Sequence, residues 1–129
     1  MTKFYTFRCD KCDDEMHFKN EFDDAYFNNE QVRMFLLEYP DGLIDFDANI
    51  YQCQNCKDMH ILPSLCMYRK NPNERMSYHI YKRYKHKCIH CQMPLIRIFG
   101  NQNDIFKKDG TYYSRKGVCP KCRGQLLID

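Results

Sequence analysis

The 129-residue sequence contains no tryptophan and no long apolar run. A membrane-spanning helix needs roughly 18 or more apolar residues in succession, and the mean hydropathy of the chain is -0.73. The first eight residues also lack the apolar core of a secretory signal peptide. These absences predict a soluble, cytoplasmic protein with no membrane partner. In that reducing setting, paired cysteines bind metal more often than they form disulfides.

The sequence also lacks the residue sets that carry catalysis. It has no Ser/His/Asp combination, no glycine-rich phosphate loop and no cluster that suggests a metal site with an open position. The histidines do not replace a missing cysteine, and we expect them to be surface or strand residues: His17, His60, His79, His86 and His90. The sequence therefore predicts a protein that is not an enzyme and has no small-molecule substrate.

Cysteine, in contrast, is abundant and regularly spaced. Eight of the nine cysteines form four Cys-x-x-Cys pairs, which are Cys9/Cys12, Cys53/Cys56, Cys88/Cys91 and Cys119/Cys122. Two residues between thiolates let a tight turn present both sulfurs to one ion, and two such turns make a closed tetrahedral site for Zn²⁺. A closed site has no position for water, so it supports folding and not hydrolysis. Four repeats of the spacing predict two structural Zn²⁺ ions, with iron, as in rubredoxins, as the alternative.

The order in which the pairs combine is less strongly specified. We expect sequential pairing, because each enclosed stretch contains its own strand signals. Site 1 then consists of Cys9, Cys12, Cys53 and Cys56, and site 2 consists of Cys88, Cys91, Cys119 and Cys122. A cross-brace, in which the first pair joins the third and the second joins the fourth, is the alternative.

Alternating and turn-bounded segments predict a small, metal-stapled and mainly β fold. The expected strands lie at 4–8, 16–22, 43–52, 59–62, 65–69, 76–81, 95–99, 111–113 and 125–128. One helix is expected near 29–39, where Val32, Phe35, Leu36 and Tyr39 follow helical spacing and Pro40 stops it. We interpret the chain as two zinc ribbons, residues 1–81 with the helix inserted and residues 82–129.

Charge divides between the two parts of the chain. Residues 1–60 have 6 Lys/Arg against 13 Asp/Glu, a net charge of -7, and residues 61–129 have 14 against 4, a net charge of +10. Such a split indicates different partners for the two halves, or halves that face each other.

Residues 4–81 resemble the CpXC domain family. The resemblance rests on Cys9-x-x-Cys12, a helix ending in Phe35-Leu36-Leu37, the Asp41-Gly42-Leu43-Ile44 segment, Cys53-x-x-Cys56 and the Pro63 to Pro72 stretch with Tyr68. Asp10 and Gln54 stand where the family name places proline. The family is prokaryotic and functionally uncharacterised, so the resemblance implies a prokaryotic or phage origin and no activity. Residues 88–129 look like a generic second ribbon.

The segment from Tyr78 to Lys87 interleaves tyrosines with basic residues. Basic groups neutralise phosphates, and tyrosine rings stack on unpaired bases. We therefore predict nucleic-acid binding, in a transcription-associated accessory role. The expected contact residues are Lys82, Arg83, Tyr84, Lys85, Lys87, Arg115 and Lys116. The alternative interpretation is a solvated edge strand whose lysines prevent pairing with another chain.

A second hypothesis is a protein-interaction module, either an adaptor on a larger machine or a phage- or mobile-element-encoded inhibitor. It would use the acidic residues of the first half, which are Asp13, Asp14, Glu15, Glu21, Asp23, Asp24, Asp45 and Asp47. The alternative interpretation of these residues is an acidic surface that keeps the protein soluble. Cys66 stands alone, and we expect it to be a small buried apolar residue, with a reactive thiol as the alternative.

Overall fold

The computed structural model describes residues 4–19, 30–70 and 77–128. Its described part is mainly β, as expected. The strands are β1 (Phe4–Cys9), β2 (Glu15–Lys19), β3 (Leu43–Asp45), β4 (Ala48–Cys53), β5 (Met59–Pro63), β6 (Cys66–Lys70), β7 (Tyr78–Arg83), β8 (Leu95–Phe99), β9 (Ile105–Lys108), β10 (Thr111–Val118) and β11 (Gln125–Ile128). The helices are α1 (Glu30–Glu38) and the short 3₁₀ helix η1 (Gln102–Asp104). No helix in the described ranges has the length and apolarity to cross a membrane.

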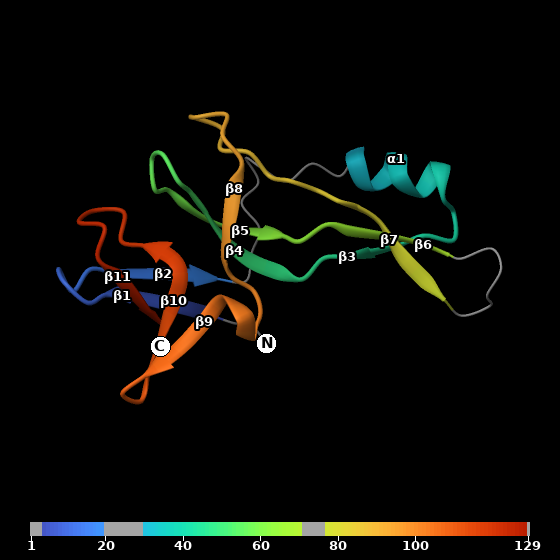
Figure 1. The fold of residues 1–129 in the computed structure, drawn as a ribbon. Coiled ribbons are helices and arrows are strands. Elements are labelled where there is room, and N and C mark those ends of the chain that lie inside the picture. The colour runs from blue at the N-terminus through green and yellow to red at the C-terminus, as the bar shows by residue number, and fades with distance from the viewer. Residues whose placement is uncertain (1–3, 20–29, 71–76, 129) are drawn as a thin grey trace.

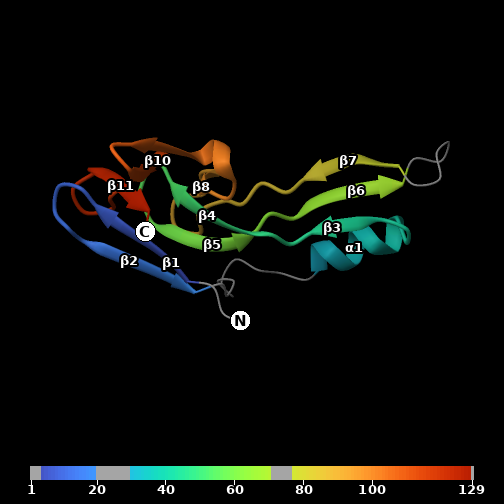
Figure 2. The same cartoon turned by 90° about the horizontal axis from the view of Figure 1, so that it is seen from below.

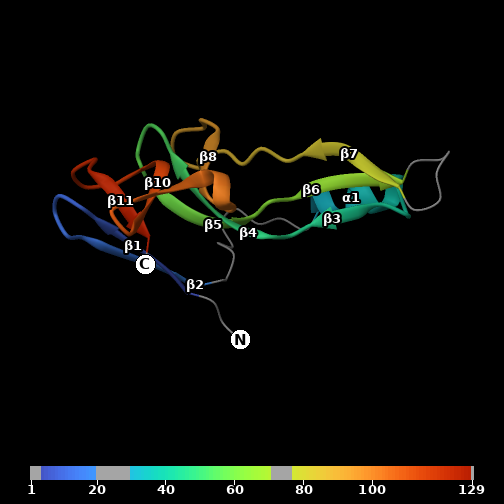
Figure 3. The same cartoon turned by 60° about the horizontal axis from the view of Figure 1, so that its bottom comes forward.

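Three sheets follow one another along an elongated molecule (Figures 1, 2 and 3). A five-stranded sheet with the order β2-β1-β11-β10-β9 forms one end. The sheet β5-β4-β8 lies in the middle, and the sheet β3-β6-β7 forms the other end together with α1. The first and last strands of the chain are neighbours, because Phe7 pairs with Ile128 and Cys9 with Leu126 in an antiparallel register.

This topology does not follow the expected division into residues 1–81 and 82–129. β1 pairs with β11, and β4 pairs with β8, so both contacts cross the proposed boundary. The physical reason is the size of the two parts, because segments of 81 and 48 residues bury little apolar surface and are only marginally stable alone. The two halves instead share their sheets and two buried apolar clusters, of which the larger is the main core.

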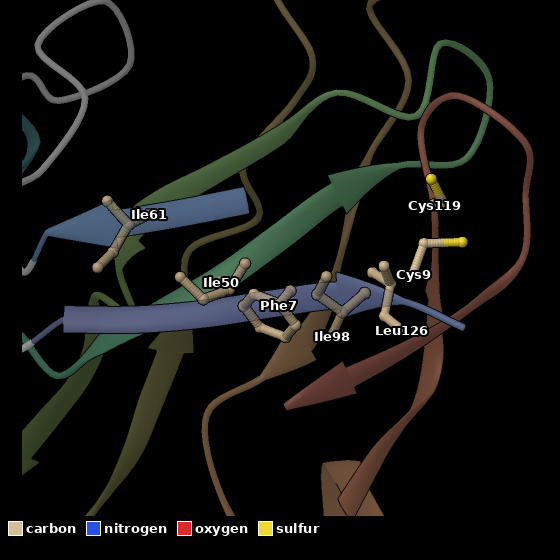
Figure 4. Packing of buried hydrophobic residues seen from close by; sticks show 7 residues of the cluster. All are labelled: Phe7, Cys9, Ile50, Ile61, Ile98, Cys119 and Leu126. Atoms are coloured by element: carbon tan, nitrogen blue, oxygen red, sulfur yellow. The ribbon is translucent and has the colours of Figure 1, made fainter. Parts of the chain in front are cut away.

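That core lies between the five-stranded sheet and the middle sheet (Figure 4). Its buried members come from five strands and two knuckles, and they are Phe7, Cys9, Ile50, Ile61, Ile98, Cys119 and Leu126. The Phe7 ring meets Phe18 and Phe99 edge-on, with ring centroids 5.9 and 6.0 Å away. Two of the buried residues are cysteines, so the core packs directly against a cysteine cluster.

The expected strand at 43–52 is two strands in two different sheets. β3 pairs with β6 and β4 with β5, and the chain bends at Phe46 and Asp47 between them. The Asp47 backbone N–H donates to Asp45 Oδ1 at 2.9 Å, and Ser64 fixes the bend by donating to the backbone oxygens of Asp47 and Asp45. A polar side chain that bonds its own backbone favours a turn over a ladder, so the apolar alternation alone was misleading here. β9 was not expected either.

Helix α1 falls within the range 29–39. Phe35 is buried, and the Phe35 and Tyr39 rings lie 5.9 and 4.8 Å from the ring of Tyr81 in β7. The helix ends before Pro40, where the Gly42 N–H donates to the Tyr39 oxygen. Leu36, a member of the expected apolar face, remains exposed, so only part of that face is covered.

Candidate metal centres and basic edge

All four Cys-x-x-Cys pairs fold into the same hairpin knuckle. In each knuckle, the residue after the second cysteine donates its backbone N–H to the carbonyl of the first cysteine. These bonds are Asp13 to Cys9 (3.2 Å), Lys57 to Cys53 (3.0 Å), Gln92 to Cys88 (2.8 Å) and Arg123 to Cys119 (2.9 Å). The first cysteine in turn donates its N–H to the carbonyl five residues later. The repeated spacing therefore predicted one repeated local structure.

The residue after the second cysteine has a positive φ in every knuckle. The values are 57° for Asp13, 67° for Lys57, 59° for Gln92 and 62° for Arg123. This left-handed region favours glycine because a side chain crowds the backbone there. The chain accepts four non-glycine residues at this position, which indicates that the knuckle geometry is imposed by the contacts around it.

The first cluster joins the first and the last knuckle of the chain. It consists of Cys9, Cys12, Cys119 and Cys122. The Sγ atoms of Cys9 and Cys122 are 3.2 Å apart, and those of Cys12 and Cys119 are 3.7 Å apart. Asp10 connects the two knuckles, because its N–H donates to the Gln125 carbonyl and its Oδ1 accepts from the Gln125 N–H.

The second cluster joins the two inner knuckles and consists of Cys53, Cys56, Cys88 and Cys91. The Sγ atoms of Cys56 and Cys88 are 3.7 Å apart. Asn55 serves both knuckles: its backbone N–H donates to Cys53 Sγ at 3.4 Å, and its Nδ2 donates to Cys91 Sγ at 3.2 Å. The sequence analysis did not identify Asn55, because nothing in the spacing shows which knuckle its side chain faces.

The expectation of sequential pairing is wrong, and so is the cross-brace alternative. The clusters are nested: the first cysteine pair meets the fourth, and the second meets the third. Strand pairing decides this arrangement. β1 lies beside β11, which brings Cys9 next to the knuckle before β11, and Cys53 pairs in register with Leu95, just after the third knuckle. All eight predicted ligands therefore lie in clusters of four, but each cluster combines one pair predicted for site 1 with one pair predicted for site 2.

Both clusters fit a tetrahedral ion. The four Sγ atoms of each cluster lie within 4.8 Å of one another. A Zn–S distance of about 2.3 Å in a tetrahedron places sulfurs about 3.8 Å apart, which lies within the observed spacings. All four donors are thiol sulfurs, which suit zinc or iron.

The thiols of one cluster cannot all ionise easily without a cation. Burial raises the pKa of Cys9, but backbone N–H groups of Cys12 and Lys11 outweigh it and lower the pKa to about 7. For Cys12, the Asp14 N–H lowers the pKa, but loss of solvation and the neighbouring sulfurs raise it to about 12. The second cluster repeats the contrast. Burial raises the pKa of Cys88, but backbone N–H groups of its knuckle outweigh it and lower the pKa to about 6. For Cys56, a backbone N–H group lowers the pKa, but loss of solvation and the neighbouring sulfurs raise it to about 12. A bound cation would remove this repulsion.

Five of the predicted nucleic-acid contacts lie on or just after β7. This strand is the edge of its sheet, and all six of its residues are exposed. Lys82 and Arg83 end the strand, and Lys85 and Lys87 are exposed on the segment that follows. On β6, Arg69 and Lys70 pair in register with His79 and Tyr78. We call these basic residues of β6, β7 and the segment after β7 the basic strip: Arg69, Lys70, Lys82, Arg83, Lys85 and Lys87.

The other two predicted contacts lie elsewhere. Arg115 and Lys116 belong to β10 in the five-stranded sheet, and no strand pairing among the described residues connects β10 with β7. The Arg115 guanidinium lies over the Phe106 ring, 5.5 Å from its centroid. The structure therefore does not combine these residues with the basic strip. The sequence alone could not show whether the two groups lie together.

The acidic residues of the alternative hypothesis are also dispersed. Asp13, Asp14 and Glu15 lie at the first knuckle, where Asp14 accepts from Lys121 at 3.1 Å. Asp45 and Asp47 lie at the bend between β3 and β4. Glu21, Asp23 and Asp24 lie outside the described residues.

Two residues outside the clusters and the basic strip, Cys66 and His86, are both buried. Cys66 is buried, as expected. His86 is buried as well, contrary to a surface position, and its Nε2 lies 2.7 Å from the Pro63 carbonyl oxygen. Burial lowers the His86 pKa, and the contact with Pro63 raises it by a smaller amount.

Comparison of the chain with family models, curated proteins and solved structures gave no match. The resemblance of residues 4–81 to the CpXC family therefore stays a prediction.

Proposed function

We propose that the chain is a non-catalytic scaffold, held together by two Zn²⁺ ions, that binds nucleic acid through the basic strip. Cys9, Cys12, Cys119 and Cys122 would hold one ion, and Cys53, Cys56, Cys88 and Cys91 the other. Each ion would neutralise four crowded thiolates and fix two knuckles. Metal analysis of the purified protein should give about two zinc ions per chain. One ion, or iron in place of zinc, would contradict this part of the proposal.

The observation that carries the nucleic-acid proposal is that every residue of β7, at the edge of its sheet, has an exposed face. Tyr78 and Tyr81 expose 39% and 41% of their surface next to Lys82 and Arg83. Backbone phosphates attract such cations, and tyrosine faces stack on bases regardless of sequence. An edge strand also leaves room for an extended single strand to lie along it.

Acidic groups near the strip weaken the attraction of a phosphate to the basic residues beside them. Glu38 and Asp41 lie near Arg69 and Lys70, since these four residues line one shallow pocket. Lys82 lies at the other end of the strand, where Glu38 also lines a neighbouring pocket with it, whereas Lys85 and Lys87 are exposed on the segment after the strand. We therefore assign the main phosphate contacts to Lys82, Arg83, Lys85 and Lys87.

Salt-dependent binding tests the proposal. The zinc-loaded protein is titrated into labelled 20-nucleotide single strands and duplexes at 50, 100 and 200 mM salt, with anisotropy as the readout. The variant Lys82→Glu/Arg83→Glu/Lys85→Glu/Lys87→Glu should lose binding. For a single strand, log affinity falls with log salt with a slope of about 0.7 per phosphate contacted, so the loss of four contacts should reduce the slope by about 3.

A matched variant separates local contacts from net charge. Lys107→Glu/Lys108→Glu/Arg115→Glu/Lys116→Glu makes the same charge change on β9 and β10. It should bind far better than the strip variant at each salt concentration. Equal losses in the two variants, with zinc content unchanged, would show that total charge and not the strip determines binding.

A further inference from the structure

A polar cavity of about 360 Å³ opens beside the basic strip. It lies where the sheet β3-β6-β7 meets the sheet β5-β4-β8, and Arg83 of the strip forms part of its wall. Ligand pockets range from about 300 to 1,000 Å³, so this cavity suits a ligand of the size of one nucleoside. Resting on the proposed function, we propose that the cavity receives a single unstacked base of a bound strand and prefers a base with an exocyclic amino group.

Aromatic walls provide the first argument. Tyr51, Tyr68 and Tyr84 line the cavity. Two of these rings are held in place by His86, whose ring lies 5.2 Å from that of Tyr51 and 5.1 Å from that of Tyr84, both edge-on. His86 is itself buried and contacts the Pro63 oxygen. Single-stranded bases are bound by splaying out and stacking on aromatic side chains, and these tyrosines are already ordered for that role.

Charge provides the second argument. Arg83 is exposed and forms the part of the wall where the cavity meets the strip, and Asp45 and Asp47 line the same cavity. Arg97 also lines it, but its Nε is paired with Asp104 Oδ2 at 3.0 Å. Two carboxylates repel a phosphate and accept hydrogen bonds from neutral donors. A phosphate therefore stays at Arg83 and the strip, and the neutral base is the part of a nucleotide that fits the interior.

Hydrogen-bond chemistry determines which base is preferred. A carboxylate has about four acceptor sites and no donor when ionised. Asp45 uses one of them for the Asp47 N–H. Cytosine presents an N4 amino donor, whereas thymine presents the O4 acceptor at the same position. Thymine would place that oxygen against a carboxylate, so the cavity favours cytosine over thymine at equal size.

Two oligonucleotides of equal length and charge test this inference. Zinc-loaded protein is titrated with labelled dC10 and dT10 at one salt concentration, and dC10 should bind about tenfold more tightly, as expected for one base-edge contact. In the variant Asp45→Asn/Asp47→Asn, this preference should fall to about twofold or less. The preference and not the absolute affinity is the readout, because the loss of two negative charges strengthens binding of both strands.

The matched control is Asp13→Asn/Asp109→Asn. It removes the same charge at two exposed positions away from the cavity, with φ values of 57° and 52° that asparagine tolerates. It should retain the full dC10 preference. A direct probe is NMR titration with cytidine and uridine monophosphates, in which cytidine monophosphate should shift the amides of Tyr51, Tyr68 and Asn101.

The outcomes separate the two proposals. If dC10 and dT10 bind equally well and the strip variant abolishes both, nucleic-acid binding stands and the cavity inference is overturned. If the control loses the preference as fully as the cavity variant, the cavity is also not its source. If neither strand binds, the proposed function fails, and the inference fails with it.

Discussion

Gln52 and Val118, 66 residues apart in sequence, are joined by two hydrogen bonds. Gln52 Nε2 donates to the Val118 carbonyl at 2.7 Å, and the Val118 N–H donates to Gln52 Oε1 at 3.0 Å. The same Nε2 donates to the Lys57 carbonyl at 2.9 Å. Gln52 is buried, precedes Cys53 and so connects the second knuckle with the strand that leads into the fourth. One side chain therefore links the frameworks of both cysteine clusters.

Replacing this side chain should destabilise the whole protein. In Gln52→Leu the partly buried backbone groups of Val118 and Lys57 lose their partners, which should lower the free energy of unfolding by about 2–4 kcal/mol. Urea unfolding of the zinc-loaded protein measures it. Gln54→Leu, at an exposed position two residues later, is the control and should change stability by less than about 0.5 kcal/mol. Similar effects of the two variants would contradict the linking role of Gln52.

The nested arrangement predicts which pairs of cysteine substitutions act on one site. Cys12→Ser/Cys122→Ser damages only the first cluster, so the protein should retain one tightly held metal ion. Cys12→Ser/Cys56→Ser damages both clusters and should retain none. Metal content after dialysis against a weak chelator provides the measurement. Sequential pairing predicts the reverse result, so the two variants together discriminate between the arrangements.

Gly124 should control the metal affinity of the first cluster alone. A Cβ atom at this position would lie 2.8 Å from Cys9 Sγ and 3.1 Å from the Lys11 side chain. Gly124→Ala must displace the sulfur or the knuckle, and overpacking costs about 1–3 kcal/mol. One of the two ions should therefore be released at about tenfold lower chelator concentration. Gly110→Ala, in open space but at a φ of 81°, should leave metal release unchanged. Equal weakening of both ions would argue against a local contact.

The left-handed position of the fourth knuckle should distinguish glycine from β-branched residues. Arg123 has a φ of 62°. Arg123→Val forces a branched side chain into this conformation and should lower the free energy of unfolding by about 1–2 kcal/mol. Arg123→Gly relieves the crowding and should leave stability unchanged or slightly raised. Thermal unfolding of both variants in zinc-containing buffer measures the difference. If valine and glycine behave alike, the knuckle is not held in this conformation in solution.

The sequence predicted much of the local structure, because local structure depends on neighbouring residues. Alternation before Cys53 and after Cys56 predicted the hairpin of β4 and β5, and the spacing of Phe35 and Tyr39 predicted helix α1. The prediction from the sequence failed at Asp45 to Asp47, where hydrogen bonds from side chains to the backbone end one strand and start another in a different sheet. Apolar periodicity does not record such bonds.

The sequence by itself determined that eight cysteines form four knuckles, because two-residue spacing and the turn that it permits are local properties. It also determined that a tyrosine-rich basic segment precedes Cys88. Only the tertiary structure decided that Cys9 meets Cys122 and that Asn55 reaches Cys91. Those contacts depend on β1 lying beside β11 and β4 beside β8, and such pairings arise when two small halves bury a common core. The pairing of β3 and β7 with β6 placed Asp45 and Arg83 on either side of Cys66 in the wall of one cavity, although 37 residues separate them in the chain.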